Sequence, residues 1–393
     1  MRAFVVALLL ALMIGACGHD DRGVVLWHSY TGPERAALEA TAATWNQQHP
    51  ETPLVLVAVP HDAFADKISS AVPRGNGPDL FIYAQDRIGD WADSGVIEPV
   101  EFWVDDARAD RFSDESLGAM AYKGSLWGLP LAVKSLALFY RTDLVPSPPA
   151  TTDDLIAMAK SLRAQGVFAL AYANVDLYGH APWLHGFGGR VLDDNGNFAI
   201  ATPEAEAAMT FARTLVADGI VPADAQDPQV ASDFNRGKAA MALQGPWFIA
   251  GIGKDVPWQV APLPIVSATG KPAAPFLGAE GILMSARARD KDAAFAVMDA
   301  LTGDAAAVTR ARDARQVVAN KHAYDDPAVA KDPVLRAFRA QLAHTVPMSN
   351  SPEMRSVWTP YRTALGEVLD GRAEPGSQLL RVEREVKRYT EGR

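Results

Sequence analysis

The chain has 393 residues, of which 49% are hydrophobic and 21% are charged, and its formal net charge is -10 at pH 7. The composition is that of a globular protein, and the length suits two lobes better than one hydrophobic core. Because nucleic-acid binding requires a basic surface, the negative charge argues against nucleic acid as a partner.

The N-terminal segment has the order of a secretory signal peptide. Arg2 precedes an apolar run over residues 3–14, and small residues follow before Cys17. This run is too short to span a bilayer as a helix. Cys17 is the only cysteine, so neither an intramolecular disulfide nor a cysteine-rich metal site is expected.

The residues around Cys17 point to an anchor. Ile14-Gly15-Ala16-Cys17 resembles the lipobox of bacterial lipoproteins, in which the cysteine is lipidated and becomes the mature N-terminus. The resemblance implies a signal peptide over residues 1–17, lipidation of Cys17 and a tether over 18–23. An unmodified cysteine in an ordinary signal peptide is the alternative.

Strand and helix patterns alternate through the first part of the mature chain. Apolar strands and amphipathic helices are predicted in the order 24–27, 33–48, 54–59, 61–72 and 80–83. This βαβ alternation predicts an α/β fold with a doubly wound sheet.

Candidate binding residues follow the third strand. Open α/β sheets bind ligands beyond the carboxyl ends of their strands, which places Tyr83, Asp86 and Arg87 at the edge of such a crevice. Alternatively, Tyr83 only ends a core strand, while Asp86 and Arg87 form a surface ion pair.

The pattern changes near Lys134, which interrupts two extended apolar runs over 127–133 and 136–140. Lys134 either faces outward from a strand or points into a cleft where the chain crosses between lobes. Further along, Trp247 follows a strand over 239–243 and repeats the arrangement of Tyr83. In a helix predicted over 352–369, Met354, Trp358 and Arg362 have the spacing of one helical face.

Enzyme motifs are largely missing from the sequence. It contains no His-Glu-x-x-His, Cys-x-x-Cys or Gly-x-Ser-x-Gly, so no catalytic residue, metal or cofactor is predicted. Residues 251–255 lack the upstream glycine and the Ser or Thr of a phosphate loop, and His180 and His185 favour packing over metal ligation. A glycoside hydrolase with a carboxylate pair such as Asp86 and Asp176 remains an alternative.

Four aromatic residues stand beside polar groups: Tyr83, Tyr178, Trp247 and Trp358. Flat aromatic faces pack against the apolar faces of sugar rings, while charged side chains hold the hydroxyl groups. The set therefore indicates a carbohydrate site, with core packing of each aromatic as the alternative.

From about Val24 to its C-terminus, the chain resembles the bacterial maltose and maltodextrin-binding proteins, the substrate-binding components of ABC sugar importers. The matching segments are 77–79 with Asp86-Arg87, 139–144, 234–237, 245–247, and 348–354 followed by Trp358 and Arg362. The resemblance implies a two-lobed periplasmic-binding-protein-like fold with a hinged cleft between the lobes. The implied lobes are 24–132 with 281–328, and 133–280 with 329–393.

The same resemblance implies roles for the candidate residues. Tyr83 corresponds to a sugar platform, Asp86 and Arg87 to hydroxyl ligands, and Arg362 to a polar neighbour. The remaining matches are an acidic ligand, an aromatic ligand and two stacking indoles: Asp176, Tyr178, Trp247 and Trp358.

Three positions depart from the family. The maltose binders carry Asp-Lys where this chain has Tyr30-Thr31, and a ligand glutamate where it has Lys134; the aromatic after the last tryptophan is Thr359. These departures alter which hydroxyls can be held, so a glucose-containing di- or oligosaccharide, of the maltodextrin or trehalose type, is expected rather than plain maltose.

The predicted protein is a monomeric, lipid-anchored receptor in the periplasm or at the cell surface. It binds sugar by hinge closure and presents it to the membrane permease of an ABC importer. The alternatives are a secreted glycoside hydrolase or lyase that uses the same cleft, and a receptor for a polyamine or iron. Iron is disfavoured because no paired tyrosines with a nearby His or carboxylate stand out, and a polyamine would require a more acidic cleft.

Overall fold

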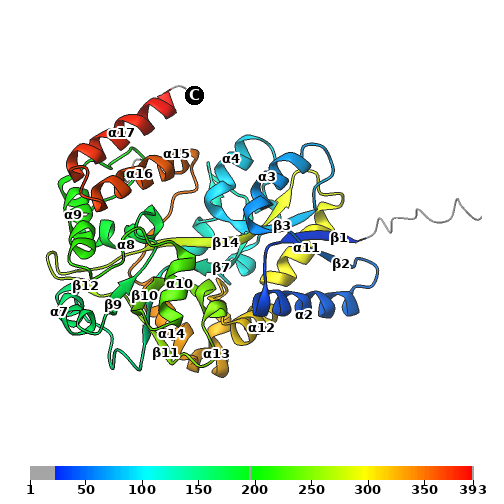
Figure 1. Cartoon of the computed structure of the whole chain (residues 1–393). Coiled ribbons are helices and arrows are strands. Elements are labelled where there is room, and N and C mark those ends of the chain that lie inside the picture. Colours follow the sequence, from blue (N-terminus) through cyan, green and yellow to red (C-terminus); the bar gives the residue numbers. More distant parts are fainter. Residues whose placement is uncertain (1–22, 194–195, 392–393) are drawn as a thin grey trace, which may run out of the picture.

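The computed structural model describes residues 23–193 and 196–391 (Figure 1). Cys17 and the predicted signal peptide lie outside these residues, as does the tether up to residue 22. Within the part of the chain that is described, no helix has both the length and the apolar character needed to cross a membrane.

The first sheet has seven strands and contains the predicted βαβ alternation. Its main order is β15-β14-β3-β1-β2, and β4 and β7 also pair with β14. The strands are β1 (Val24–His28), β2 (Leu54–Ala58), β3 (Leu80–Ala84), β4 (Ile97–Glu98), β7 (Gly128–Lys134), β14 (Phe276–Ser285) and β15 (Val346–Pro347). β1 is parallel to β2 and β3, so the three carboxyl ends lie at one edge, while β14 runs antiparallel to β3.

Helices flank this sheet, with α3 and α4 above the strands and α2 and α12 below them in the view of Figure 1. They are α2 (Gly32–Gln48), α3 (His61–Ala71), α4 (Ile88–Asp93), α11 (Lys291–Thr302) and α12 (Asp304–Ala314). Leu38 and Trp45 give α2 a buried face, as the helical spacing predicted. A short helix, η1 (Gln85–Arg87), links β3 to α4.

The second sheet has four strands in the order β11-β8-β10-β9. They are β8 (Ala137–Arg141), β9 (Phe168–Ala171), β10 (Ala239–Gln244) and β11 (Trp258–Ala261). The larger helices of this half are α7 (Thr152–Arg163), α8 (Leu177–Phe187), α9 (Pro203–Ala217), α10 (Asp227–Asn235), α14 (Pro333–Leu342), α16 (Trp358–Leu369) and α17 (Pro375–Glu391). Thr151 and Thr202 are N-caps, and their side chains accept hydrogen bonds from the first turns of α7 and α9. Two sheets with flanking helices confirm the α/β class.

The remaining elements are short. They are η2 (Glu101–Trp103), α5 (Asp106–Ala109), α6 (Asp114–Gly118), β5 (Ala121–Tyr122), β6 (Ser125–Leu126), η3 (Pro246–Gly251), β12 (Ile265–Val266), β13 (Lys271–Pro272), η4 (Lys321–Asp325), α13 (Pro327–Lys331) and α15 (Pro352–Ser356).

Two strands of the first sheet, β7 and β14, lie where the chain passes between the two halves. β7 ends at Lys134 in the first sheet, and β8 begins three residues later in the second. β14 enters the first sheet at Phe276, where it pairs with Val346, and continues past Gly278, opposite Lys134. The predicted lobe boundaries at 132/133 and 280/281 fall within these two strands and remain a prediction.

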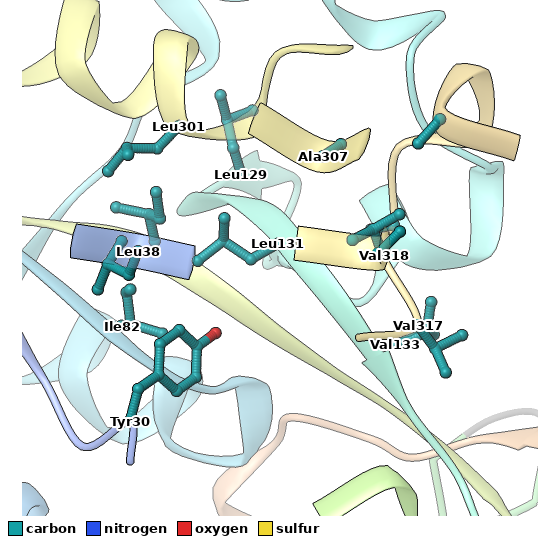
Figure 2. Close-up of a cluster of buried hydrophobic side chains, with 14 of the residues drawn as sticks. Tyr30, Leu38, Ile82, Leu129, Leu131, Val133, Leu301, Ala307, Val317 and Val318 are labelled. Carbon is teal, nitrogen blue, oxygen red and sulfur yellow. The ribbon is translucent and has the colours of Figure 1, made fainter. Parts of the chain in front are cut away.

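The hydrophobic core of the first half contains Tyr30 as well as aliphatic residues. Figure 2 shows the Tyr30 ring beside Ile82, with Leu38 and Leu131 nearby. Leu131 and Ile82 are fully buried or nearly so, and burial of such a side chain contributes roughly 1.5–3 kcal/mol. This packing fixes the strand ends from which the candidate site residues project.

The predicted helix over 352–369 is wrong in one respect, because it is divided at Val357 into α15 and α16. Pro360 lacks an N–H and its ring would collide with the carbonyl of Ser356 in a continuous helix. In the first turn of a new helix, proline is tolerated. The division places Trp358 at the start of α16 and leaves Met354 buried in α15.

Candidate functional site

The first group of predicted residues lies at the carboxyl end of β3. Tyr83 is half-buried, and its ring stacks against Phe64 at 5.4 Å and His61 at 6.0 Å between centroids. Trp91 packs edge-on at 5.2 Å. The ring is therefore held firmly, and burial raises the pKa of the Tyr83 hydroxyl above its ordinary value.

Asp86 and Arg87 follow directly in η1, and both are half-buried. Burial raises the pKa of Asp86, and the charges of Arg87 and Arg355 partly oppose this shift. Between them and β3 lies Gln85, which is fully buried; its side chain donates to the carbonyl of Met348 (3.3 Å) and accepts from the amide of Ala279. Gln85 thus ties η1 to β14 and to the segment that follows β15.

The second group lies around α8 and α16. Asp176 caps α8 by accepting from the Tyr178 amide at 3.0 Å, and it forms an ion pair with Arg362 of α16. The Tyr178 ring lies 6.2 Å from Trp247 and 6.3 Å from Phe276, between centroids. The charged pair and the aromatic pair are therefore neighbours.

Trp247 is presented to solvent by the turn that precedes it. It is 40% exposed, and its indole nitrogen donates to Gln244 at 3.1 Å. A Cβ atom on Gly245 would lie 2.2 Å from the indole ring, so only glycine permits this orientation. Gly245 therefore allows the Trp247 indole to fold back over the turn.

Trp358 completes the aromatic group. It is half-buried, and its ring packs edge-on against Phe276 at 6.4 Å. Phe276 thus contacts both Tyr178 and Trp358, and through Tyr178 the group extends to Trp247. The structure brings together three of the four aromatics that the sequence singled out, while Tyr83 lies with the first group.

The third group contains Tyr30 and Lys134. Tyr30 is 5% exposed and donates from its hydroxyl to Glu280 Oε2 at 2.6 Å. The Lys134 ammonium lies 3.3 Å from Glu280 Oε2 and 3.5 Å from Glu34 Oε1. Burial alone would lower the pKa of Lys134, but the two carboxylates raise it above its ordinary value. Thr31 is exposed at the start of α2.

β14 connects the three groups. Phe276 touches the aromatic group, Glu280 binds Tyr30 and Lys134, and Gly281 pairs with Tyr83. The five residue steps from 276 to 281 span roughly 17 Å at about 3.3 Å per residue. All three groups therefore lie along one strand, and the site residues remain a prediction.

Sequence reasoning did not select Glu34, Glu280 or Phe276. Glu280 interrupts the apolar run Phe276–Ser285 much as Lys134 interrupts its own, and that signal could have identified it. His61 is exposed, and its ring is nearly parallel to that of Tyr83, with 12° between the planes. It carried no such signal, because its position predicts only the start of an ordinary amphipathic helix.

The structure gives little support for metal binding or for a phosphate loop at residues 251–255. His180 and His185 are both buried in α8, which agrees with packing rather than ligation, and burial lowers their pKa values to about 3 and about 4. In residues 23–193 and 196–391, no three His, Cys, Asp or Glu side chains are grouped so as to hold a metal ion. In segment 251–255, the Asn235 side chain binds the Gly251 carbonyl and the Gly253 amide.

Comparison with known proteins identifies relatives along nearly the whole chain. The sequence pattern of the family described as bacterial extracellular solute-binding protein matches residues 29–308. The maltotriose-binding protein of Pyrococcus abyssi is 28% identical over 386 residues, covering 96% of this chain and 84% of that protein. The galactooligosaccharide-binding protein of Bacillus subtilis is 24% identical and covers 96% of this chain and 94% of its own length.

Solved structures agree with these relatives. The maltotriose-binding protein of Thermus thermophilus, bound with maltotriose, superposes with a TM-score of 0.83 at 27% identity, covering 93% of this chain and 100% of that one. A cyclo/maltodextrin-binding protein complexed with maltotetraose gives the same TM-score at 26% identity, with 94% and 97% coverage. The match confirms the predicted two-lobed, periplasmic-binding-protein-like fold.

Proposed function

Since the chain belongs to the family of bacterial extracellular solute-binding proteins, we propose that it is the carbohydrate-binding component of an ABC importer. Its ligand is a glucose-containing di- or oligosaccharide of the maltodextrin or trehalose type. The relatives named above are maltotriose- and galactooligosaccharide-binding proteins, which supports an oligosaccharide. They are binding proteins rather than enzymes, which favours a receptor over a secreted glycoside hydrolase or lyase.

One observation carries the proposal most directly. Tyr178, Trp247 and Trp358 gather around Phe276, beside the ion pair of Asp176 and Arg362. Aromatic faces suit the apolar faces of pyranose rings, and a charged pair beside them offers both an acceptor and a donor to hydroxyl groups. A site for an anion or a metal would not require so many aromatic rings.

The binding step uses the two groups that β14 connects through Phe276 and Gly281. Tyr83, Asp86 and Arg87 form the contact surface of the first lobe, and Asp176, Tyr178, Trp247, Trp358 and Arg362 form that of the second. Ligand stabilises the closed arrangement because only that arrangement contacts it from both lobes. Tyr30, Thr31 and Lys134 make up the third group of the proposed site, and no covalent chemistry is needed.

The cellular setting is part of the same proposal. Lipidation of Cys17 holds the receptor at a membrane, in the periplasm or at the cell surface, and residues 18–23 act as the tether. The receptor works as a monomer and delivers its ligand to the permease of the importer. Metabolic labelling with a fatty-acid analogue tests the anchor, and a Cys17→Ser variant that is still labelled would contradict it.

Isothermal titration of the mature protein against maltose, maltotriose, trehalose and sucrose tests the ligand class, with tryptophan fluorescence as a second readout. We expect heat and a spectral change with at least one glucoside, because Trp247 is exposed in the unbound structure. A chain that gives neither signal with any of the four sugars is not a receptor of this class. Recovery of cleaved sugar after incubation would indicate the hydrolase instead.

A further inference from the structure

A cluster of charged side chains lies beside the site, on α2, β7 and β14. It contains Glu34, Lys134 and Glu280, and we call it the hinge cluster. Lys134 lies 3.5 Å from Glu34 and 3.3 Å from Glu280. Tyr30 donates to Glu280 at 2.6 Å, and Gln316 donates to Glu34 at 3.2 Å.

The hinge cluster lies at the edge of the sheet where ligands bind. Glu280 is paired with Ala84, the last residue of β3, and Lys134 is the last residue of β7, opposite Gly278. Glu34 lies in the first turn of α2, which follows the carboxyl end of β1. The three charges therefore occupy the crevice edge of an open α/β sheet, at the same level as Tyr83.

Lys134 offsets the charge of one of the two carboxylates, and the side chains of the cluster are only partly covered. Side-chain exposure is 25% for Glu34, 15% for Glu280 and 18% for Lys134. Behind them the buried Arg310 donates to the Gln316 side chain at 3.0 Å. Carboxylates at such a depth are costly unless cations accompany them, and Lys134 and Arg310 supply that compensation.

Each carboxylate uses one oxygen within the protein and leaves the other available. Glu280 Oε2 serves both Tyr30 and Lys134, and Glu34 Oε1 serves both Lys134 and Gln316. Within residues 23–193 and 196–391, Glu280 Oε1 and Glu34 Oε2 receive no hydrogen bond. Neither oxygen is buried away from solvent. Both oxygens are therefore open to solvent and can only accept hydrogen bonds.

We propose that Glu280 and Glu34 are ligand-binding residues, whose available oxygens accept hydrogen bonds from hydroxyl groups of the sugar. Lys134 is a positioning residue, which fixes both carboxylates and neutralises part of their charge. This proposal rests on the function proposed above and names two residues that the family resemblance did not supply.

The arrangement also determines a ligand class. Two carboxylates that accept and do not donate require hydroxyl donors, so neutral sugars fit. A sugar with its own carboxylate would meet like charges at close range, which opposes binding. The hinge cluster therefore selects neutral oligosaccharides over uronic-acid sugars, and Lys134 does so indirectly, through the glutamates.

Titration calorimetry with maltotriose and trehalose tests these roles in single variants of the mature chain. Glu280→Gln and Glu34→Gln each replace one charged acceptor with a neutral amide of similar shape, and we expect affinity to fall roughly tenfold or more, the usual effect of a hydrogen bond to a charged group. Lys134→Met should weaken binding similarly, and Lys134→Arg should restore part of the loss. Glu39→Gln, on the exposed face of α2 and paired with Arg35 at 2.7 Å, should bind like the wild type.

A combined variant separates positioning from direct contact. If Lys134 acts only through the carboxylates, Lys134→Met causes no further loss of affinity once Glu34→Gln and Glu280→Gln are both present. A further loss would mean that Lys134 itself contacts the ligand and would overturn its positioning role. Thermal unfolding of every variant shows which of them are folded.

Two failures can be told apart. If the wild type binds a sugar and folded Glu280→Gln and Glu34→Gln variants bind it equally well, the hinge cluster is structural and this inference is wrong, while the receptor function stands. If the wild type binds no sugar at all, the receptor function fails first, and the cluster has no sugar to bind.

Discussion

Phe276, the first residue of β14, packs edge-on against Trp358, the first residue of α16, with 6.4 Å between the ring centroids. The contact joins a strand of the first sheet to a helix that packs in the second half of the chain. Phe276 is 3% exposed, and its other ring neighbours are Tyr178 and His185. One buried ring therefore positions two of the proposed sugar-stacking residues.

Replacing Phe276 should affect both stability and binding. Phe276→Ala removes a buried ring, so we expect the free energy of unfolding to fall by about 3–5 kcal/mol. Tyr178 and Trp358 lose their common support, so sugar affinity of the remaining folded protein should also decrease. Phe276→Leu keeps most of the volume and should cost less than half as much stability. Chemical denaturation and calorimetry measure the two effects, and equal losses in both variants would contradict the packing role.

Trp247 should behave differently, because 40% of it is exposed. Trp247→Ala removes little buried area, and we expect the unfolding midpoint to change only slightly. If the indole stacks on a sugar ring, affinity should fall by roughly 2 kcal/mol, the loss expected for an aromatic anchor. Phe102→Ala is the matched control, since Phe102 is 85% exposed in η2 of the first half and should leave affinity unchanged. Unaltered binding by Trp247→Ala would remove this residue from the site.

Much of the fold could be predicted because its signals are local. The apolar strands and amphipathic helices of the first 90 residues follow their own periodicity, and the caps at Thr151 and Thr202 lie next to the turns that they serve. α8 was not predicted, because nearly all of its residues are buried and Pro182 lies inside it. A helix that is apolar all round has no helical stripe to detect.

The site was less predictable, since its contacts join distant parts of the chain. Tyr83 and Trp247 follow strands and could be selected from local patterns. Glu280 could be linked to Tyr30 only once the sheet had placed residues 250 apart in sequence side by side. For Lys134 the sequence left open an outward-facing strand position or a place in a cleft, and its partners Glu34 and Glu280 could not be read from local patterns.

Gly89 allows the segment after β15 to approach α4. A Cβ atom at this position would lie 2.6 Å from the Asn350 carbonyl oxygen and 2.8 Å from Pro352 Cδ, and the Gly89 amide donates to that same oxygen. Gly89→Ala must push the segment away, so we expect a loss of about 1–3 kcal/mol in unfolding free energy. Gly118→Ala, in α6 with nothing within 4 Å of the added atom, should be neutral or stabilising. Thermal unfolding of both variants makes the comparison.

Asp79 should make the first lobe sensitive to acid. Burial alone would raise the pKa of Asp79, but hydrogen bonds from the Arg289 side chain and from the amides of Arg289 and Val25 lower it below its ordinary value. A lowered pKa means that the carboxylate stabilises the fold above its unfolded-state pKa, and that this contribution is lost as pH falls through the folded value. Asp79→Asn should therefore cost about 2 kcal/mol at pH 7 and progressively less below pH 4. A constant difference across this pH range, measured by urea unfolding, would contradict this assignment.

His180 should contribute a second acid sensitivity, at higher pH. Both of its ring nitrogens are buried, and neither has a hydrogen-bond partner among the residues that the structure describes. Burial lowers its pKa to about 3, whereas the unfolded chain takes up a proton near pH 6.5. Between these values the unfolded state binds more protons, so stability falls as pH decreases from about 6.5 towards 3.

His180→Phe removes this proton uptake while keeping an aromatic ring beside Tyr361, whose centroid lies 5.9 Å away. We expect the variant to gain stability relative to the wild type on going from pH 7 to pH 4, by about 3 kcal/mol from the difference in pKa. The relative gain is the decisive measurement, because the larger ring can lower stability equally at every pH. Parallel urea-unfolding curves at both pH values, with the same offset between wild type and variant, would show that His180 is not the acid-sensitive group.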